Sequence, residues 1–315
     1  MAYKKKLIIM ISLISILTLA YIASFLFSPE FTGSRSAFHT WIDTRLSSGI
    51  SRIRISLPQD SMEFIKRGNL WFVSYNNNEY PARQLRIGDF ISIFTTRAQW
   101  PVRYTHSDSH PRIGLDLESA SRVSVYSDNT LLLDILLGAA DTAGDVFVRR
   151  FGQNEVRSGS SLISTYARDS VSSWYNLRII PETEGGSIDA SHVQRLTVYV
   201  ENQPPQIFSR RNRQWELSGL DVSNPDQNDI ETYVRTILNI DGEDFADDIS
   251  PSDPVFNHGR LVFELGTGNI ITIRISDLDE SGRRYANVNG SNYVYAVPAW
   301  ASSWMIRTAA DFEVR

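Results

Sequence analysis

The sequence predicts an α+β fold class: an N-terminal transmembrane helix followed by two repeated units, each a mainly antiparallel sheet with an amphipathic helix packed on it. Three observations predict this class. A long uncharged run follows three lysines at the N-terminus. A pattern of aromatic and basic residues occurs twice at a constant spacing. Each copy of that pattern is followed by apolar residues at the spacing of one helix face and then by alternating strands.

The uncharged run extends from Leu7 to Phe27 and directly follows Lys4, Lys5 and Lys6. Because an α-helix rises about 1.5 Å per residue, the run would cover roughly 30 Å, the thickness of the hydrocarbon core of a bilayer. The lysines favour a cytoplasmic N-terminus. We therefore expect a single-pass protein of the bacterial inner membrane, with the bulk of the chain periplasmic or extracytoplasmic.

A cleaved secretory signal is the alternative interpretation of this run. Such signals have apolar stretches of about 7–15 residues and end in a small-x-small cleavage site. Here the stretch is longer, and the candidate Ala23 has Tyr21 two positions before it. The chain contains no cysteine, which excludes a lipid-modified cysteine, a disulfide and a thiolate metal site. Either interpretation places most of the chain across the membrane.

Four side chains around a tryptophan recur at a constant spacing of 144 residues, which indicates an internal duplication. The matched pairs are Phe64 and Phe208, Arg67 and Arg211, Trp71 and Trp215, and Ser74 and Ser218. Tryptophan occurs only seven times in the chain, so a chance match is a poor explanation. Because these tryptophans recur together with their strands, we interpret them as core residues.

Each copy then shows apolar residues at i, i+3, i+4 and i+7, one face of a helix. These residues are Ile87, Phe90, Ile91 and Phe94 in the first copy, and Ile230, Tyr233, Val234 and Ile237 in the second. Alternating runs at 53–57 and 196–200 predict strands before the helices, and similar runs predict several strands after them. Each copy ends in Ser-Ser-Trp, at 172–174 and 302–304, which we interpret as a matched closing segment.

These patterns divide the chain into six segments. The predicted boundaries are a cytoplasmic N-terminus at 1–6, a transmembrane anchor at 7–27, a juxtamembrane segment at 28–50, repeat unit 1 at 51–180, a linker at 181–191 and repeat unit 2 at 192–315. Phe38, Trp41, Ile42 and Leu46, within residues 38–46, suit a short amphipathic helix just above the membrane, which would either pack on the first unit or lie in the membrane interface. Trp41 and Trp100 have no repeat partner, so we expect them to be more exposed than the other tryptophans.

An anchor followed by two such units is similar to a known family. The residues that carry the resemblance are the Ile-x-Ile-x-Leu strand, the Arg-x₃-Trp pairs, Ile113-Gly-Leu-Asp116, Phe147-Val-Arg149 and Trp174-x-x-Leu-Arg178. Beyond the anchor, nearly the whole chain resembles the bacterial domain-of-unknown-function family numbered 4340. The second unit departs from the pattern because it lacks a clear Gly-Leu counterpart of Gly114 and Leu115.

The resemblance implies an accessory role. Members of the family are single-span envelope proteins, often encoded beside ABC-type transport components related to gliding-motility systems. It implies a non-catalytic, membrane-anchored extracytoplasmic accessory or scaffold subunit, with polytopic membrane proteins of an ABC-type transport complex as partners. The resemblance supplies no catalytic residue. If Gly114 and Leu115 mark a working surface, only the first unit carries it.

The motifs for common reaction sites are missing from the sequence. His106, Asp108 and His110 form one compact group of metal-ligand residue types. They lie in a polar stretch between two prolines, so a solvated loop is favoured over a metal site. The Gly-x-Ser-x-Gly elbow and a glycine-rich phosphate loop are absent. We therefore expect no cofactor and no catalysis.

Two other functions stay open on the sequence alone. Exposed aromatic residues would suit a module that binds an envelope polymer, peptidoglycan or polysaccharide. A hydrolase of such polymers would need two carboxylates that meet in a cleft, which spacing does not reveal among 36 acidic residues. A nucleic-acid partner is excluded, because the formal net charge is −5 and nucleic-acid-binding domains carry a concentrated basic surface.

Overall fold

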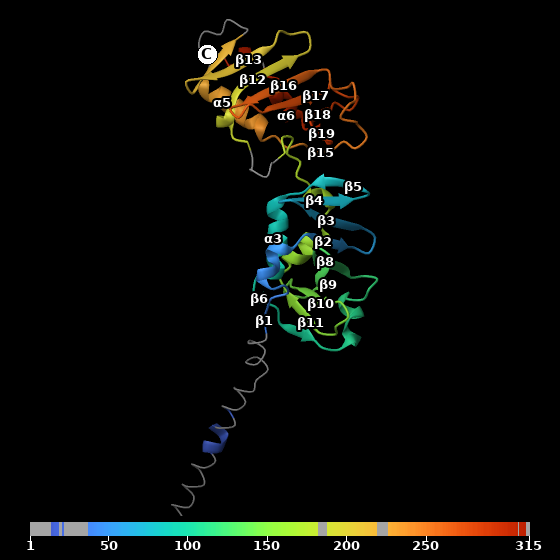
Figure 1. Cartoon of the computed structure of the whole chain (residues 1–315). Coiled ribbons are helices and arrows are strands. Elements are labelled where there is room, and N and C mark those ends of the chain that lie inside the picture. Colours follow the sequence, from blue (N-terminus) through green and yellow to red (C-terminus); the bar gives the residue numbers. More distant parts are fainter. Residues whose placement is uncertain are drawn as a thin grey trace, which may run out of the picture. The chain divides into compact units, whose positions relative to one another are not determined.

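The computed structural model describes residues 14–18, 21, 37–181, 188–218, 226–307 and 309–312. The chain divides into two compact units, with the boundary between Tyr175 and Asn176. Each unit is built on one antiparallel sheet, with nine strands in unit 1 and eight in unit 2 (Figure 1). A further two-stranded sheet belongs to unit 1.

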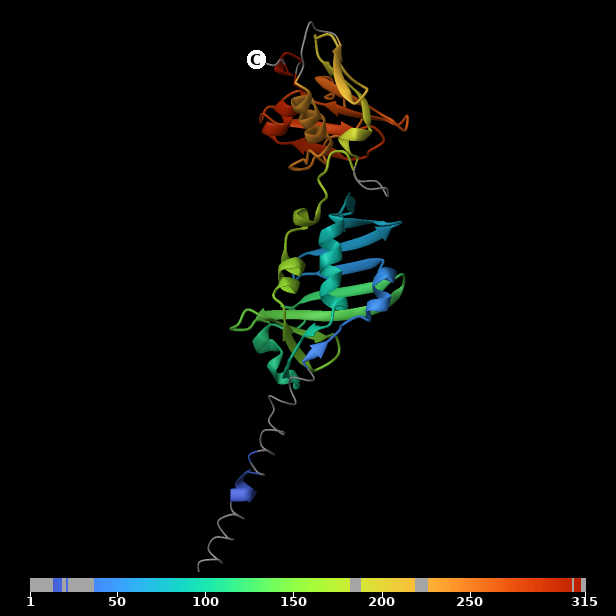
Figure 2. The same ribbon diagram turned by 90° about the vertical axis from the view of Figure 1, so that its left-hand side faces the viewer.

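Unit 1 places one long helix and one short helix against its sheet. Its elements are β1 (Phe38–His39), η1 (Thr44–Gly49), β2 (Arg52–Ser56), β3 (Ser61–Arg67), β4 (Leu70–Tyr75), β5 (Asn78–Pro81), α3 (Gln84–Thr95), β6 (Ala98–Gln99), β7 (Val102–Tyr104), η2 (Ser107–Ser109), η3 (Pro111–Ile113), β8 (Ser121–Ser127), β9 (Thr130–Ala140), β10 (Val146–Arg150), β11 (Val156–Gly159), α4 (Leu162–Arg168) and η4 (Val171–Trp174). The large sheet has the order β5-β4-β3-β2-β8-β9-β10-β11-β7. Figure 2 shows α3 lying across one face of this sheet.

Unit 2 has a corresponding set of elements. They are η5 (Ala190–His192), β12 (Val193–Val200), β13 (Gln206–Arg211), β14 (Gln214–Ser218), α5 (Gln227–Leu238), β15 (Asp244–Phe245), β16 (Gly259–Leu265), β17 (Ile270–Ile275), β18 (Arg284–Val288), β19 (Val294–Val297), α6 (Ala299–Met305) and η6 (Ala309–Phe312). The sheet has the order β14-β13-β12-β16-β17-β18-β19-β15.

The two sheets repeat one topology. From β4 to β7, the strand order of unit 1 corresponds position by position to the order from β14 to β15 in unit 2. In both units an edge strand that comes after the long helix in the sequence, β7 or β15, pairs with the last strand of the unit, β11 or β19. The registers also correspond, since Ile53 lies opposite Phe64 and Leu196 lies opposite Phe208. The structure therefore shows a β-rich chain with repeated sheet units.

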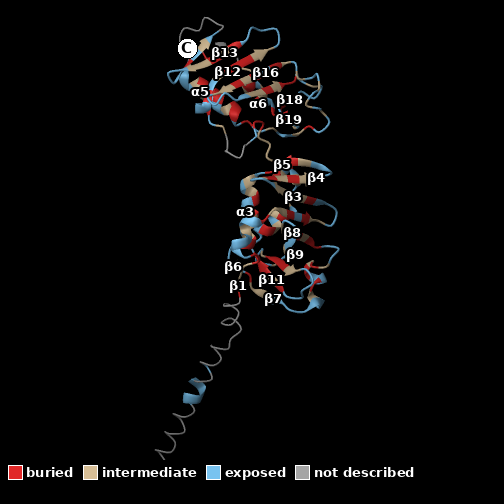
Figure 3. Cartoon of the chain, in the orientation of Figure 1, coloured by how far each residue is buried: buried red, intermediate tan, exposed pale blue. Residues whose placement is uncertain are grey.

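The core of each unit lies between the sheet and the long helix. Ile87, Phe90 and Phe94 on α3 are fully buried. On α5 the apolar face at i, i+3, i+4 and i+7 is buried in the same way, with Ile237 as its last member. Figure 3 shows the buried residues concentrated on the strands and on the inner side of these helices. The helical spacing in the sequence thus marks the side chains that cover each sheet.

The predicted α+β class is corrected by the structure. Every described ladder is antiparallel, and the residues form mostly β-sheet with few helices. Each unit sets one helix of 12 residues and one of 7 residues against eight or nine strands. The physical reason is that one long helix and one short helix are enough to cover one face of each sheet.

The predicted transmembrane anchor at 7–27 is also corrected. Among the described residues, no helix combines the length and the apolar character needed to cross a membrane. Within 7–27 the structure describes the helical residues 14–18 and 21, and the rest of that span lies outside the described residues. A spanning helix needs about 20 consecutive residues. The inner-membrane localisation rested on this anchor and is withdrawn with it.

The segment from 38 to 46 does not form the expected amphipathic helix. It contributes strand β1, which pairs with β6, and part of the 3₁₀-helix η1. Trp41 and Trp100 were expected to be exposed, but they are only 4% and 1% exposed and pack edge to face at 5.3 Å between ring centroids. The reason is tertiary packing: the backbone N–H of Trp41 donates to the carbonyl of Phe94 at the end of α3.

Candidate functional site

The first residue of each long helix binds the backbone of the repeated tryptophan. In unit 1 the side-chain oxygen of Gln84 accepts from the Trp71 N–H at 2.8 Å, and its amide nitrogen donates to the Trp71 carbonyl at 3.1 Å. In unit 2 Gln227 makes the same two bonds with Trp215, at 2.6 and 2.9 Å. Each glutamine thereby fixes the start of its helix against a strand. The comparison of the two repeats in the sequence missed both glutamines. Gln84 follows Trp71 by 13 residues, and Gln227 follows Trp215 by 12 residues.

The end of each unit packs into its core through one aromatic side chain. The ring contacts are Trp174 with Phe64 and Phe90 in unit 1, and Phe312 with Phe208 and Tyr233 in unit 2, at centroid distances of 4.7 to 5.7 Å. The residue before each long helix donates a backbone hydrogen bond to the same aromatic residue, from Arg83 to Trp174 and from Asp226 to Phe312. Phe312 is therefore the structural counterpart of Trp174.

The predicted match between the two Ser-Ser-Trp segments is wrong. Residues 172–174 belong to the 3₁₀-helix η4, whereas residues 302–304 lie inside α6. The 138-residue spacing that relates Trp174 to Phe312 instead relates Tyr166 to Trp304. We therefore interpret the Ser-Ser-Trp triplet as a chance recurrence. Contacts with the long helix show which residues correspond at the ends of the two units.

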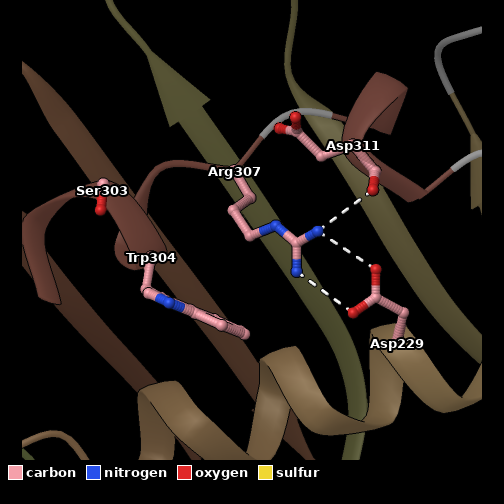
Figure 4. Close-up of a pocket in the computed structure, with 5 residues that line it drawn as sticks. All are labelled: Asp229, Ser303, Trp304, Arg307 and Asp311. Carbon is pink, nitrogen blue, oxygen red and sulfur yellow. Dashed lines mark hydrogen bonds and ion pairs between the residues drawn. The ribbon is translucent and has the colours of Figure 1, made fainter. Parts of the chain in front are cut away.

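An arginine lies between the two matched aromatic positions of unit 2. The guanidinium of Arg307 is 5.1 Å from the centroid of the Trp304 ring and 4.3 Å from that of Phe312. Its two terminal nitrogens donate to the two carboxylate oxygens of Asp229 on α5, at 3.3 and 3.1 Å. One of these nitrogens also donates to the backbone carbonyl of Asp311 (Figure 4). Ring contacts and hydrogen bonds together hold the charge in place.

Unit 1 contains the same arrangement with the charges exchanged. Arg86 on α3 stands where Asp229 stands on α5, at the third residue of the helix. Its guanidinium lies 4.9 Å from the Tyr166 centroid and 4.7 Å from the Trp174 centroid, and it donates to Asp169 at 2.5 Å. Asp169 is 138 residues before Arg307, so the acid and the base have changed places between the units.

The Arg307 arrangement borders a surface pocket of about 460 Å³. The pocket is lined by Asp229, Ser303, Trp304, Arg307 and Asp311 (Figure 4). It offers a half-buried indole, a guanidinium and carboxylate oxygens within one hollow. Such a combination can bind a polar ligand through hydrogen bonds and contact with an aromatic ring. We take this pocket as the candidate functional site.

The three weak metal candidates are not brought together as ligands. His110 is buried, and its Nε2 lies 3.1 Å from the backbone oxygen of Asn154. His106 and Asp108 are exposed at the 3₁₀-helix η2. In the part of the chain that the structure describes, no group of three or more histidine, cysteine or acidic residues is placed to hold a metal ion. The ring of His110 is used to fix a loop.

The Gly-Leu pair of unit 1 forms a turn that packs into the core. Gly114 has a φ of 67°, a left-handed conformation that favours glycine, and ends the 3₁₀-helix η3. The side chain of Leu115 is fully buried, and its carbonyl accepts hydrogen bonds from Arg149. A working surface at this pair therefore does not include the Leu115 side chain.

No protein-family model, curated protein or solved structure matches this chain. The resemblance to family 4340 accordingly stays a prediction from the sequence. Any proposal of function therefore depends on the geometry of the two units and on that prediction from the sequence.

Proposed function

We propose that the chain is a non-catalytic accessory or scaffold subunit that binds partner proteins through the same face of both units. One observation carries this proposal. In the first turn of the short helix of each unit, an apolar side chain is left in solvent: Leu162 on α4 is 55% exposed and Trp300 on α6 is 57% exposed. They are separated by the 138 residues that also relate Tyr166 to Trp304.

Single exposed apolar residues are common on protein surfaces and need no explanation. What supports binding here is their recurrence at one position of a duplicated unit, four residues before the matched aromatic residues Tyr166 and Trp304. Tryptophan is also among the residues that contribute most to protein interfaces. Two such contacts on one chain would strengthen binding through effective concentration.

The resemblance to family 4340 identifies the partners that we propose. They are polytopic membrane proteins of an ABC-type transport complex. The negative formal charge of −5 fits a role without nucleic acid. In this proposal the chain contributes binding surfaces and its partners contribute any transport or catalysis.

The test is recovery of partners from the native cells with tagged full-length protein, measured by quantitative cross-linking and mass spectrometry. We expect wild type to recover the same transport proteins in a constant ratio, and Leu162→Asp with Trp300→Asp to lose them. The matched control is Leu131→Asp with Leu278→Asp, at apolar positions that are 49% and 56% exposed. If the control loses the partners equally, or the double variant keeps them, the proposal is wrong.

Polymer binding is a second candidate function, and the pocket beside Trp304 favours it. An indole ring can contact the face of a sugar, while Asp229 and Arg307 can exchange hydrogen bonds with hydroxyl groups. For this candidate we propose binding without cleavage, because Asp229, one of the two acidic residues that line the pocket, already accepts hydrogen bonds from Arg307 at both of its oxygens.

The second candidate is tested by sedimentation of the full chain with purified peptidoglycan and with insoluble polysaccharides. Wild type should pellet with one of these polymers, and Trp304→Leu should stay in the supernatant. Trp300→Leu is the control, because Trp300 lies on the same helix but does not line the pocket. Equal pelleting of wild type and Trp304→Leu would argue against the pocket as a polymer site.

A further inference from the structure

The two units close in the same way. We define the closing segments as residues 162–174, which contain α4 and η4, and residues 299–312, which contain α6 and η6. Each segment places an aromatic side chain, Trp174 or Phe312, against the long helix and a strand of its own unit. Each also accepts one backbone hydrogen bond from the residue before that helix. These contacts are of one kind in both units, so they discriminate poorly between the two long helices.

A chain with two copies of one topology faces a specific folding error. A closing segment can dock on the helix of the wrong unit, in the same chain or in a second copy of the chain. Misassembly of this kind is characteristic of multidomain and repeat proteins. Exchange of identical elements between copies is also an easy route to dimers. The correct docking therefore needs a contact that differs between the units.

The ion pair is such a contact. In correct docking Arg86 meets Asp169, and Asp229 meets Arg307. In crossed docking Arg86 would face Arg307 and Asp169 would face Asp229, so both pairs would bring like charges together. The two arginine side chains are only 23% and 20% exposed, so water and salt screen these charges less than they would at the open surface. Like charges at a contact of this kind reject a wrong partner.

We infer that the reversed polarity of this ion pair makes each closing segment specific for its own unit. The aromatic contacts and the backbone hydrogen bonds can form whether a closing segment docks on the helix of its own unit or on that of the other unit. The charges permit the correct pairing and oppose the crossed one. This role is independent of which partner or polymer the chain binds.

The experiment exchanges the polarity of unit 1 in the full chain, with Arg86→Asp and Asp169→Arg together. Both correct pairs remain opposite in charge, but the crossed pairs become opposite as well. The protein is refolded from urea at increasing protein concentration and separated by size-exclusion chromatography. We expect a several-fold larger share of chains in species larger than the native protein, rising with concentration.

The control exchanges both units, adding Asp229→Arg and Arg307→Asp to the first variant. This makes crossed docking bring like charges together again, so refolding should return to the wild-type yield. A unit-1 exchange that refolds like wild type would overturn the inference. A full exchange that refolds as badly as the single one would also overturn it, because the substitutions themselves would then be the cause. If the unit-1 exchange does not fold, the unit-2 exchange alone gives the same test.

Discussion

Arg307 and Asp229 join the end of unit 2 to helix α5 through two hydrogen bonds, and the corresponding pair in unit 1 has the opposite polarity. Both units thus contain this ion pair, but the long helix carries the arginine in unit 1 and the aspartate in unit 2. The aromatic positions around the pair are kept in both units. This relationship connects the fold, the candidate pocket and the stability of each closing segment.

Replacing Arg307 with alanine should destabilise unit 2. Asp229 would lose two charge-assisted hydrogen bonds and the two rings would lose the guanidinium between them, so we expect a loss of about 1.5–3 kcal/mol. Arg307→Lys should recover only part of this loss, because lysine lacks the planar fork. Urea unfolding followed by circular dichroism measures the effect. The control Arg235→Ala, at an exposed position of α5, should change stability by no more than about 0.5 kcal/mol. Equal losses in both variants would contradict the prediction.

The glutamine that begins each long helix should be as important as a core residue. Gln227→Ala would leave the N–H and the carbonyl of Trp215 without their side-chain partner, at a cost of roughly 1–3 kcal/mol. Gln227→Glu keeps an acceptor for the N–H but places a second acceptor against the carbonyl, so it should not restore wild-type stability. Urea unfolding of both variants and of Gln84→Ala checks this. A Gln227→Glu variant as stable as wild type would show that the bond to the carbonyl contributes nothing.

Asp279 should make unit 2 sensitive to acid. Hydrogen bonds from the Tyr285 hydroxyl, the Arg283 N–H and Ser281 lower the pKa of Asp279 from 3.8 to about 2. A carboxyl whose pKa is lowered in the folded state stabilises the fold above its unfolded pKa, and that stability is lost as the pH falls towards the folded pKa. The loss should therefore occur between about pH 4 and pH 2.

The measurement for Asp279 is the urea midpoint as a function of pH. Asp279→Asn should be less stable than wild type at neutral pH, and the difference should shrink as the pH falls below about 4. Glu280→Gln, at the exposed acid next in the chain, serves as the control. A difference between Asp279→Asn and wild type that does not vary with pH would contradict the assignment.

Two glycines of unit 1 should respond in opposite directions to alanine. A Cβ on Gly159 would lie 2.3 Å from the ring of the buried Trp100, so Gly159→Ala should cost at least about 1–3 kcal/mol through overpacking. Gly88 lies on α3 with no atom within 4 Å of its Cβ position, so Gly88→Ala should stabilise the protein by about 0.5–1 kcal/mol. Thermal unfolding of both variants tests the pair. A stabilising Gly159→Ala would mean that Trp100 can move aside.

The repeat and the covering helices could be predicted from periodic apolar residues. On the predicted face of α3, Ile87, Phe90 and Phe94 are buried and Ile91 is partly buried, and the register of Phe64 and Phe208 follows from the repeated motif. The closing segment could not be predicted in the same way. Its match depends on which aromatic residue reaches the core, and the Ser-Ser-Trp triplet pointed to Trp304 in place of Phe312.

The candidate pocket could not be predicted from the sequence either. Asp229 and Arg307 are 78 residues apart, and only the docking of α6 beside α5 brings them together. The burial of Trp41 and Trp100 could not be predicted for a related reason. A missing repeat partner says nothing about burial, and the segment that contains Trp41 packs onto the end of α3. Local patterns indicate elements, whereas sites arise from contacts between elements.

The most direct test of the proposed function compares the two single variants Leu162→Asp and Trp300→Asp in full-length protein from native cells. Quantitative cross-linking with mass spectrometry measures the amount of each partner. If both units bind through the same face, each single variant should reduce recovery of the same transport proteins, and the double variant should reduce it further. Unchanged recovery, or a loss of unrelated proteins in the two variants, would contradict the account.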